Sequence, residues 1–101
     1  METSIKRRKT RSVHIGKVKV GGGASVSVQS MTKTDSADVS ATVRQIKELE
    51  ELGCEIIRLA IPNHQSALAL AQIKKKIRIP IEADIHFNPK LALESIRQGV
   101  D

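Results

Sequence analysis

The sequence predicts an α/β fold in which parallel strands alternate with helices. Two observations support this prediction. Short segments with apolar or alternating residues recur at 24–31, 55–61 and 81–87. Each of them is followed by a segment with apolar residues at helical spacing, and parallel strands need such crossover connections. Three strand-and-helix repeats imply a parallel sheet with right-handed crossovers.

The positive charge of the chain lies in its first residues. The 101 residues include 17 basic and 11 acidic side chains; residues 1–20 hold seven basic and one acidic, which leaves ten of each for residues 21–101. We therefore expect a basic N-terminal arm at residues 1–12, either solvated or in contact with phosphate or RNA. The chain has one Phe and no Trp or Tyr. Because nucleic-acid bases stack on aromatic side chains, binding of single-stranded nucleic acid through stacking is not expected.

Targeting signals and cysteine chemistry are sparse. No apolar run approaches the roughly 18 residues of a membrane span, and no apolar segment follows the basic start, so a cytoplasmic protein without membrane contact is expected. The single cysteine, Cys54, excludes an intrachain disulfide and a self-contained Cys-rich metal site. No metal-ligating residues are predicted. We expect Cys54 to be a small buried residue rather than a reactive thiol.

The first predicted element is a short hairpin. Residues 13–20 alternate apolar and polar side chains about Gly16 and Lys17, which is typical of two strands joined by a two-residue turn. Three consecutive glycines, residues 21–23, follow it. Their spacing matches no phosphate-binding motif and no helix follows directly, so we interpret them as a flexible connector rather than a phosphate cradle.

The first strand is expected at 24–31 and its helix at 39–52. Val26 and Val28 share one strand face, and small or neutral polar residues share the other, which suits a crowded barrel axis. The polar segment 32–38 is rich in residues that cap helices, and Gly53 ends the helical pattern.

The second strand, residues 55–61, is mostly apolar, as expected of a parallel strand buried on both faces. Arg58 is the exception. It is either a surface salt-bridge partner or a cation directed into a site at the end of the strand. Pro62 and Asn63 begin the next helix, which a lysine run at 74–76 closes. His64 is either a solvated first-turn residue or a substrate contact.

The third strand, residues 81–87, carries three titratable side chains on one face, namely Glu82, Asp84 and His86. Asn88 is expected to cap the following helix, with Pro89 at its first position and its end near Gly99. Ligands bind at the carboxyl ends of strands in sheets covered by helices. The alternative is an amphipathic strand of an antiparallel sheet with its polar face in water.

The fold class that follows is α/β, namely the first three β–α units of a TIM (β/α)8 barrel preceded by a short N-terminal hairpin. Eight units take about 250 residues, so residues 13–101 form a partial barrel. Three strands leave unpaired edges and a half-covered apolar face. Val100 and Asp101 are expected to begin another strand.

Particular motifs in the chain carry a resemblance to a known family. The motifs are Val28-Gln29-Ser30-Met31-Thr32, Gly53-Cys54-Glu55-Ile56-Ile57-Arg58 and Ala83-Asp84-Ile85-His86-Phe87. With them, the chain resembles the beginning of the 4-hydroxy-3-methylbut-2-enyl diphosphate synthase family over almost its whole length. The resemblance implies an oxidoreductase of the methylerythritol phosphate pathway, which reductively opens 2-C-methyl-D-erythritol 2,4-cyclodiphosphate and releases water.

The resemblance also implies cofactors and partners. In that family a TIM barrel binds the cyclic diphosphate, and a separate domain holds a 4Fe-4S cluster through three cysteines and a glutamate. Flavodoxin or ferredoxin supplies electrons, and the enzyme is a homodimer. Cys54 corresponds to a barrel residue, so the cluster domain is absent from this chain. Because one thiolate cannot hold such a cluster, we expect the chain alone to be inactive.

The predicted site combines the resemblance with residue chemistry. Arg58 is assigned to the diphosphate, because a guanidinium pairs with phosphate in a bidentate manner. Asp84 and His86 are the predicted catalytic pair, contacting substrate hydroxyls. Four further residues are predicted to bind substrate or line its pocket, namely Gln29, Ser30, Met31 and Asn88.

Two other functions remain open at this stage. One is a different phosphate-binding barrel enzyme, similar to pteroate synthase, with the same layout. The other is a non-catalytic module whose basic arm binds RNA or another protein.

Overall fold

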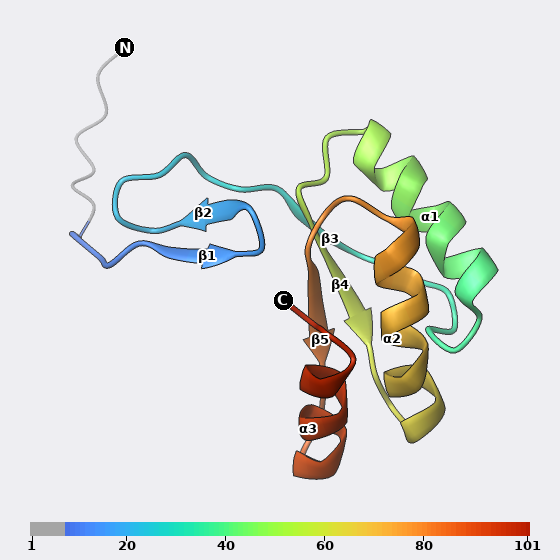
Figure 1. Ribbon diagram of the computed structural model, residues 1–101. Helices are drawn as coiled ribbons and strands as arrows, with labels where there is room; N and C mark the ends of the chain where they lie inside the picture. Colours follow the sequence, from blue (N-terminus) through green and yellow to red (C-terminus); the bar gives the residue numbers. More distant parts are fainter. Residues whose placement is uncertain (1–7) are drawn as a thin grey trace.

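A computed structural model describes residues 8–101, so Lys6 and Arg7 of the basic arm lie outside the described residues. The described chain consists of a two-stranded hairpin and a three-stranded sheet with three helices (Figure 1). The strands are β1 Val13–Ile15, β2 Val18–Val20, β3 Gln29–Met31, β4 Ile56–Ala60 and β5 Ile81–Asp84. The helices are α1 Val39–Glu51, α2 His64–Lys76 and α3 Pro89–Arg97.

The larger sheet has the strand order β3-β4-β5, and both of its pairings are parallel. A helix follows each of these strands, and the three helices lie together on one side of the sheet (Figure 1), as right-handed crossovers in one direction require. The antiparallel alternative for the third strand is therefore wrong. Among residues 8–101, no helix is both long and apolar enough to cross a membrane.

The core lies between the sheet and the helices. Ile57, Leu59 and Ile81 are fully buried on the helix-covered face. They pack in one cluster with helix residues that include Ile46, Leu70, Ile73 and Leu91. Burying a side chain of this size stabilises the fold by about 1.5–3 kcal/mol. Cys54 belongs to the same cluster and is 6% exposed, which confirms the prediction of a buried thiol.

Side-chain caps begin all three helices. The carboxylate of Asp38 accepts a hydrogen bond from the backbone N–H of Ala41. Asn63 and Ser66 form a reciprocal capping box at the start of α2. The side chain of Asn88 accepts from the first turn of α3, with Pro89 at the first helical position. The predicted helix starts at Asn63 and Asn88 are thus confirmed, because capping depends on neighbouring residues alone.

The predicted hairpin is confirmed, with Val13 paired to Val20 and Ile15 to Val18. Its turn lies against the residue that precedes β5. A Cβ atom on Gly16 would lie 2.8 Å from the Cβ atom of Pro80. Gly16 also has a positive φ of 57°, so the turn needs glycine for both its conformation and this close approach.

The triple glycine forms a turn that contacts the segment before the hairpin. Gly21 and Gly22 have φ values of 78° and 59° and pack on the backbone of the preceding segment. A Cβ atom on Gly21 would lie 2.6 Å from the carbonyl oxygen of Arg11, and the N–H of Gly22 donates to Thr10 Oγ1 over 3.0 Å. The segment is a tight turn in contact with residues 10–12, and its flexibility stays a prediction.

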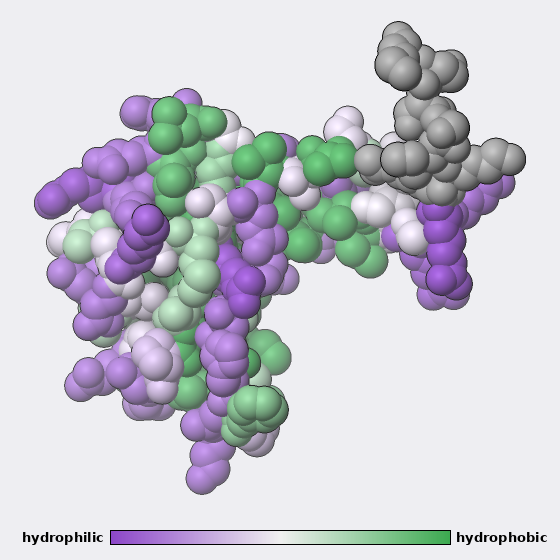
Figure 2. All heavy atoms as spheres, turned by 180° about the vertical axis from the view of Figure 1, so that it is seen from behind, coloured by the Kyte–Doolittle hydropathy of each residue, from purple (hydrophilic) through white to green (hydrophobic). Residues whose placement is uncertain are grey.

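The predicted strand at 24–31 is too long, because only Gln29–Met31 forms β3. Hydrogen bonding to the segment that leads into β4 begins at Val28. The carbonyl of Val28 accepts hydrogen bonds from the backbone N–H groups of Glu55 and Ile56. Within residues 8–101, residues 24–27 have no partner strand, and alternation alone cannot supply one. Val26 and Val28 are exposed. Figure 2, seen from behind, shows hydrophobic atoms gathered where the hairpin region joins the α/β unit.

The predicted strand at 81–87 is also too long. β5 ends at Asp84, which is paired with Ala60, the last residue of β4. Ile85, His86 and Phe87 form the connection to α3, and Phe87 has a positive φ of 53°. The ladder ends where its partner strand ends, so residues 85–87 leave the sheet despite their alternating pattern.

The end of the chain lies beside β5. Val100 and Asp101 do not form the strand that the sequence analysis expects. Asp101 nevertheless donates its backbone N–H to the carbonyl of Ile81 over 3.2 Å, and its carboxylate accepts from the N–H of Ile81 over 3.1 Å. The same carboxylate binds Lys74 Nζ at 2.8 Å. The start of β5 is thereby tied to the end of α2.

Candidate functional site

Three titratable side chains meet at the carboxyl ends of β4 and β5. Asp84 Oδ2 lies 3.0 Å from Arg58 Nη2, and Asp84 Oδ1 lies 3.1 Å from His86 Nε2. One carboxylate therefore holds a guanidinium with one oxygen and an imidazole with the other. The structure brings together the three residues to which the sequence analysis assigned the main roles.

The sheet register explains why Arg58 reaches Asp84. Ala60 is the register partner of Asp84, and Arg58 lies two residues earlier on the same face of β4. This face is opposite to the buried face of Ile57 and Leu59. His86 reaches the carboxylate differently, from the loop after β5. The expectation that Asp84 and His86 share a strand face is wrong, although their contact exists.

The three side chains differ in exposure. The side chain of Asp84 is 14% exposed, that of Arg58 40% and that of His86 75%. The salt-bridge alternative for Arg58 is confirmed by its contact with Asp84, and the alternative of a cation directed into a site stays a prediction. Arg58 Nε is buried and has no hydrogen-bond partner in residues 8–101. The inner carboxylate thus orders two outer groups, each of which keeps nitrogen atoms for a ligand.

A cavity of about 260 Å³ adjoins Asp84 and His86. Its remaining lining residues are Ala60, Ile61, Pro62, Asn88 and Leu91. Asn88 Oδ1 accepts from the N–H groups of Lys90 and Leu91 at 3.1 and 3.4 Å. The oxygen of Asn88 is therefore used by the helix cap, and its amide nitrogen is the group that remains for a ligand.

The three residues predicted on β3 do not lie together. Met31 is the register partner of Arg58, and Gln29 lies on the same face at the level of Ile56. Ser30 is paired with Ile57 on the helix-covered face. Met31 is therefore the β3 residue beside Arg58. Gln29 lies near the amino end of the sheet, and Ser30 faces away from the open side.

Two further charged residues, which are not among the predicted site residues, lie on the same face or edge of the sheet. Glu82 is the register partner of Arg58 and shares its face, which adds a second carboxylate to that side of the sheet. Its place in the alternating pattern was the available signal. Lys33 follows β3 at the same edge that carries the site. The rule that strand ends carry ligands identifies it as a candidate cation.

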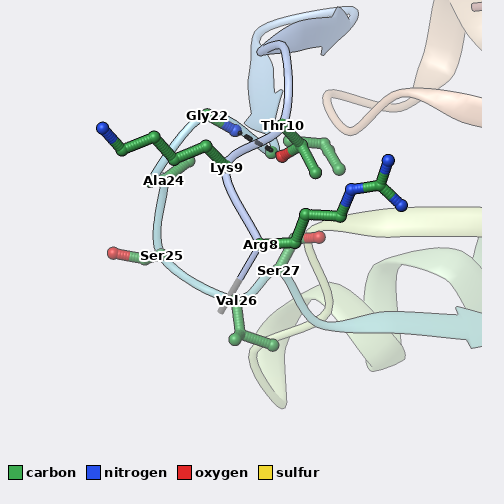
Figure 3. A pocket seen from close by; sticks show the side chains of 11 residues that line it. Arg8, Lys9, Thr10, Gly22, Ala24, Ser25, Val26 and Ser27 are labelled. Atoms are coloured by element: carbon green, nitrogen blue, oxygen red, sulfur yellow. Dashed lines mark hydrogen bonds between the residues drawn. The ribbon is translucent and has the colours of Figure 1, made fainter. Parts of the chain in front are cut away.

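A second pocket, of about 660 Å³, lies beside the hairpin. Arg8, Lys9 and Thr10 line one part of it, and the glycine turn and residues 24–27 line the rest (Figure 3). Arg58, Asp84 and His86 are not among its lining residues. The pocket is therefore separate from the strand-end site.

The described residues do not fit an iron–sulfur cluster. Cys54 is buried, and its thiol donates to the carbonyl of Ile56 over 3.1 Å. Over residues 8–101 no group of three or more His, Cys, Asp or Glu side chains is placed to hold a metal ion. A cubane cluster needs several ligands of this kind, so no cluster chemistry can be assigned to this segment.

The parallel sheet with helices on one face and ionic side chains at its carboxyl edge defines an α/β protein. Residues 10–101 match the family model described as the GcpE TIM-barrel domain, and the chain belongs to this family. It is 61% identical over 97 residues to the 4-hydroxy-3-methylbut-2-en-1-yl diphosphate synthase (flavodoxin) of Thermodesulfovibrio yellowstonii. This alignment covers 96% of this chain and 28% of the relative.

Two further relatives carry the same name. The protein of Dehalococcoides mccartyi is 57% identical over 97 residues, covering 96% of this chain and 28% of its own length. That of Ruminiclostridium cellulolyticum is 50% identical over 101 residues, covering 100% of this chain and 29% of its own length. The chain thus spans less than a third of the curated relatives it matches.

Proposed function

We propose that this chain is the N-terminal substrate-binding part of a 4-hydroxy-3-methylbut-2-en-1-yl diphosphate synthase. In this proposal, residues 13–101 supply a hairpin and the first three β–α units of a (β/α)8 barrel, and residues 1–12 precede it as a basic arm. The main structural support is the Asp84 carboxylate, which joins Arg58 and His86 at the carboxyl ends of adjacent parallel strands.

Arg58 binds the diphosphate of the cyclic substrate. Its Nη2 is held by Asp84, so the guanidinium is oriented before substrate arrives and less side-chain freedom is lost on binding. Nη1 remains for phosphate oxygens. A single Arg beside two carboxylates, Asp84 and Glu82, does not neutralise a diphosphate. Further cations are therefore needed, and Lys33 is one candidate within the chain.

His86 contacts a substrate hydroxyl. Because Nε2 faces the Asp84 carboxylate, Nε2 carries a proton and Nδ1 is the atom directed at substrate. In the neutral ring Nδ1 accepts a hydrogen bond from a hydroxyl. In the protonated ring it donates a proton to the hydroxyl that leaves as water. Gln29, Met31 and Asn88 remain proposed substrate contacts, supported by the position of Met31 beside Arg58 and of Asn88 at the cavity. Ser30 is not proposed, because it faces the helices.

The reductive step depends on groups outside this chain. The names of the relatives specify flavodoxin, and we propose flavodoxin, or alternatively ferredoxin, as the electron donor of the whole protein. A 4Fe-4S cluster, if present there, is held by other residues, because Cys54 is the one thiol here. The whole protein is further proposed to be a homodimer. The 101-residue chain, treated with iron and sulfide, is expected to show no turnover.

The test is a chimera in which this chain replaces the matching segment of the Thermodesulfovibrio yellowstonii synthase. With reduced flavodoxin, the chimera is expected to convert 2-C-methyl-D-erythritol 2,4-cyclodiphosphate. Arg58→Ala is expected to lower kcat/KM by roughly 10- to 100-fold, since hydrogen bonds to charged groups contribute about 1.5–3 kcal/mol.

Arg97→Ala is the matched control. Arg97 is an exposed arginine of α3 that lies 3.9 Å from Glu94, and it does not line the site. Its replacement is expected to leave kcat/KM unchanged. Equal losses of kcat/KM in the two variants would refute the assignment of Arg58. A folded chimera without turnover would refute the proposed function.

A further inference from the structure

Phe87 combines two features that are costly for an apolar residue. Its φ of 53° lies in the left-handed region, and among residues 8–101 no other residue except glycine has a positive φ. Its side chain is fully exposed, so packing within the described chain does not compensate for this conformation. Left-handed backbone at a bulky residue marks strain that the surrounding structure must impose.

The fixed ends of the connection impose this strain. Asp84 is held in the sheet by its pairing with Ala60, and the carbonyl of Asp84 accepts from the N–H of Ile61 over 3.0 Å. Asn88 is held by its cap on α3, and Leu91 is buried in the next turn. Three residues therefore connect two fixed points, and the chain must reverse within them.

A change of the backbone conformation at Phe87 would not affect Ile85 and His86 equally. Ile85 packs against the hydrophobic core, whereas His86 is an exposed side chain that contacts Asp84. A different backbone conformation at Phe87 would therefore move His86 before it moved Ile85. The contact between Nε2 and the carboxylate depends on the turn that follows it.

The connection after β4 supports this interpretation. It also leads to an asparagine cap, but it contains two residues, Ile61 and Pro62, and neither has a positive φ. It contributes no side chain to the ionic cluster, which consists of Arg58, Asp84 and His86. The additional residue and the left-handed turn occur together in the connection that carries the site histidine.

We propose that Phe87 is a positioning residue, whose left-handed backbone, rather than its ring, holds His86 against Asp84. The inference rests on the proposed function only for its consequence in turnover. The prediction is that residues tolerant of the left-handed region, Gly and Asn, replace Phe87 without effect, whereas a β-branched residue does not.

The direct test measures the imidazole of His86 without substrate. In the 101-residue chain with 15N-labelled histidine, Phe87→Gly and Phe87→Asn are expected to keep the ring nitrogen shifts and the Nε2–H tautomer. Phe87→Val is expected to change both towards those of an unpaired histidine. His64, an exposed histidine at the start of α2, gives the internal reference and is expected to stay constant in all variants.

The same variants in the chimera test the consequence. Phe87→Val is expected to lower kcat/KM roughly tenfold through misplacement of His86, and Phe87→Gly and Phe87→Asn to stay within about twofold of the parent. Loss of the His86 contact in Phe87→Gly and Phe87→Asn would overturn the proposal, because the ring would then be responsible. This comparison decides the matter even if Phe87→Val fails to fold.

The two proposals fail separately. A parent chimera without turnover, combined with the expected histidine spectra, contradicts the proposed function and leaves the role of Phe87 standing. Unchanged spectra in a folded Phe87→Val variant contradict the role of Phe87 whatever the turnover.

Discussion

The two faces of the parallel sheet differ in what covers them and in what their residues do. On β4, Leu59 is fully buried beneath the helices, and its neighbour Arg58 is 40% exposed and bound to Asp84. On β5, Ile81 belongs to the core and Asp84 to the ionic cluster. Residues on opposite faces of one strand thus have different surroundings, so we expect that stability and the proposed ligand binding can be changed independently.

The largest effect is expected from Leu59→Ala. Removing a large buried side chain leaves a cavity, and the free energy of unfolding is expected to fall by about 2–5 kcal/mol. Urea unfolding of the 101-residue chain, followed by circular dichroism, measures the change. A loss below about 1 kcal/mol would show that the helix-covered face is not the stabilising one.

The open face is expected to behave in the opposite way. Asp84→Asn in the chimera is expected to lower kcat/KM roughly 10- to 100-fold, because both Arg58 and His86 lose their anionic partner. The free energy of unfolding is expected to change by only about 0–1 kcal/mol, since the two partners are partly exposed. A destabilisation as large as that of Leu59→Ala would contradict the division between the faces.

A smaller effect is expected at the cap of α2, one of the helices that cover the core. Asn63→Ala removes the acceptor for the N–H of Ser66 at 2.9 Å, and it is expected to lower the free energy of unfolding by about 0.5–2 kcal/mol. The same urea titration measures it. Gln65→Ala, at an exposed position of the same turn, is the control and is expected to have little effect.

The smallest expected effect concerns Cys54, which belongs to the covered side. Its buried thiol is expected to react with a disulfide reagent only as fast as the chain opens. Leu59→Ala is expected to speed this reaction, whereas Asp84→Asn is not. Equal rates in both variants would indicate that opening at Cys54 is local and does not report on the sheet.

Local chemistry explains the parts of the fold that the sequence analysis predicted. The helix starts at Asn63 and Asn88 depend on a few neighbouring residues. The strand ends at 24–28 and 85–87 were predicted wrongly, because a strand extends only as far as its partner does. Residues far apart in the sequence form that partner, and the alternating pattern contains no information about them.

For the candidate site, the sequence by itself determined which groups are available: a lone arginine in an apolar strand, and an aspartate two residues before a histidine. Only the tertiary structure decided that Asp84 binds both Arg58 and His86, that Ser30 faces the helices, and that Phe87 turns the chain back. The physical reason is that register and loop closure are set by contacts between distant segments, whereas side-chain chemistry is set residue by residue.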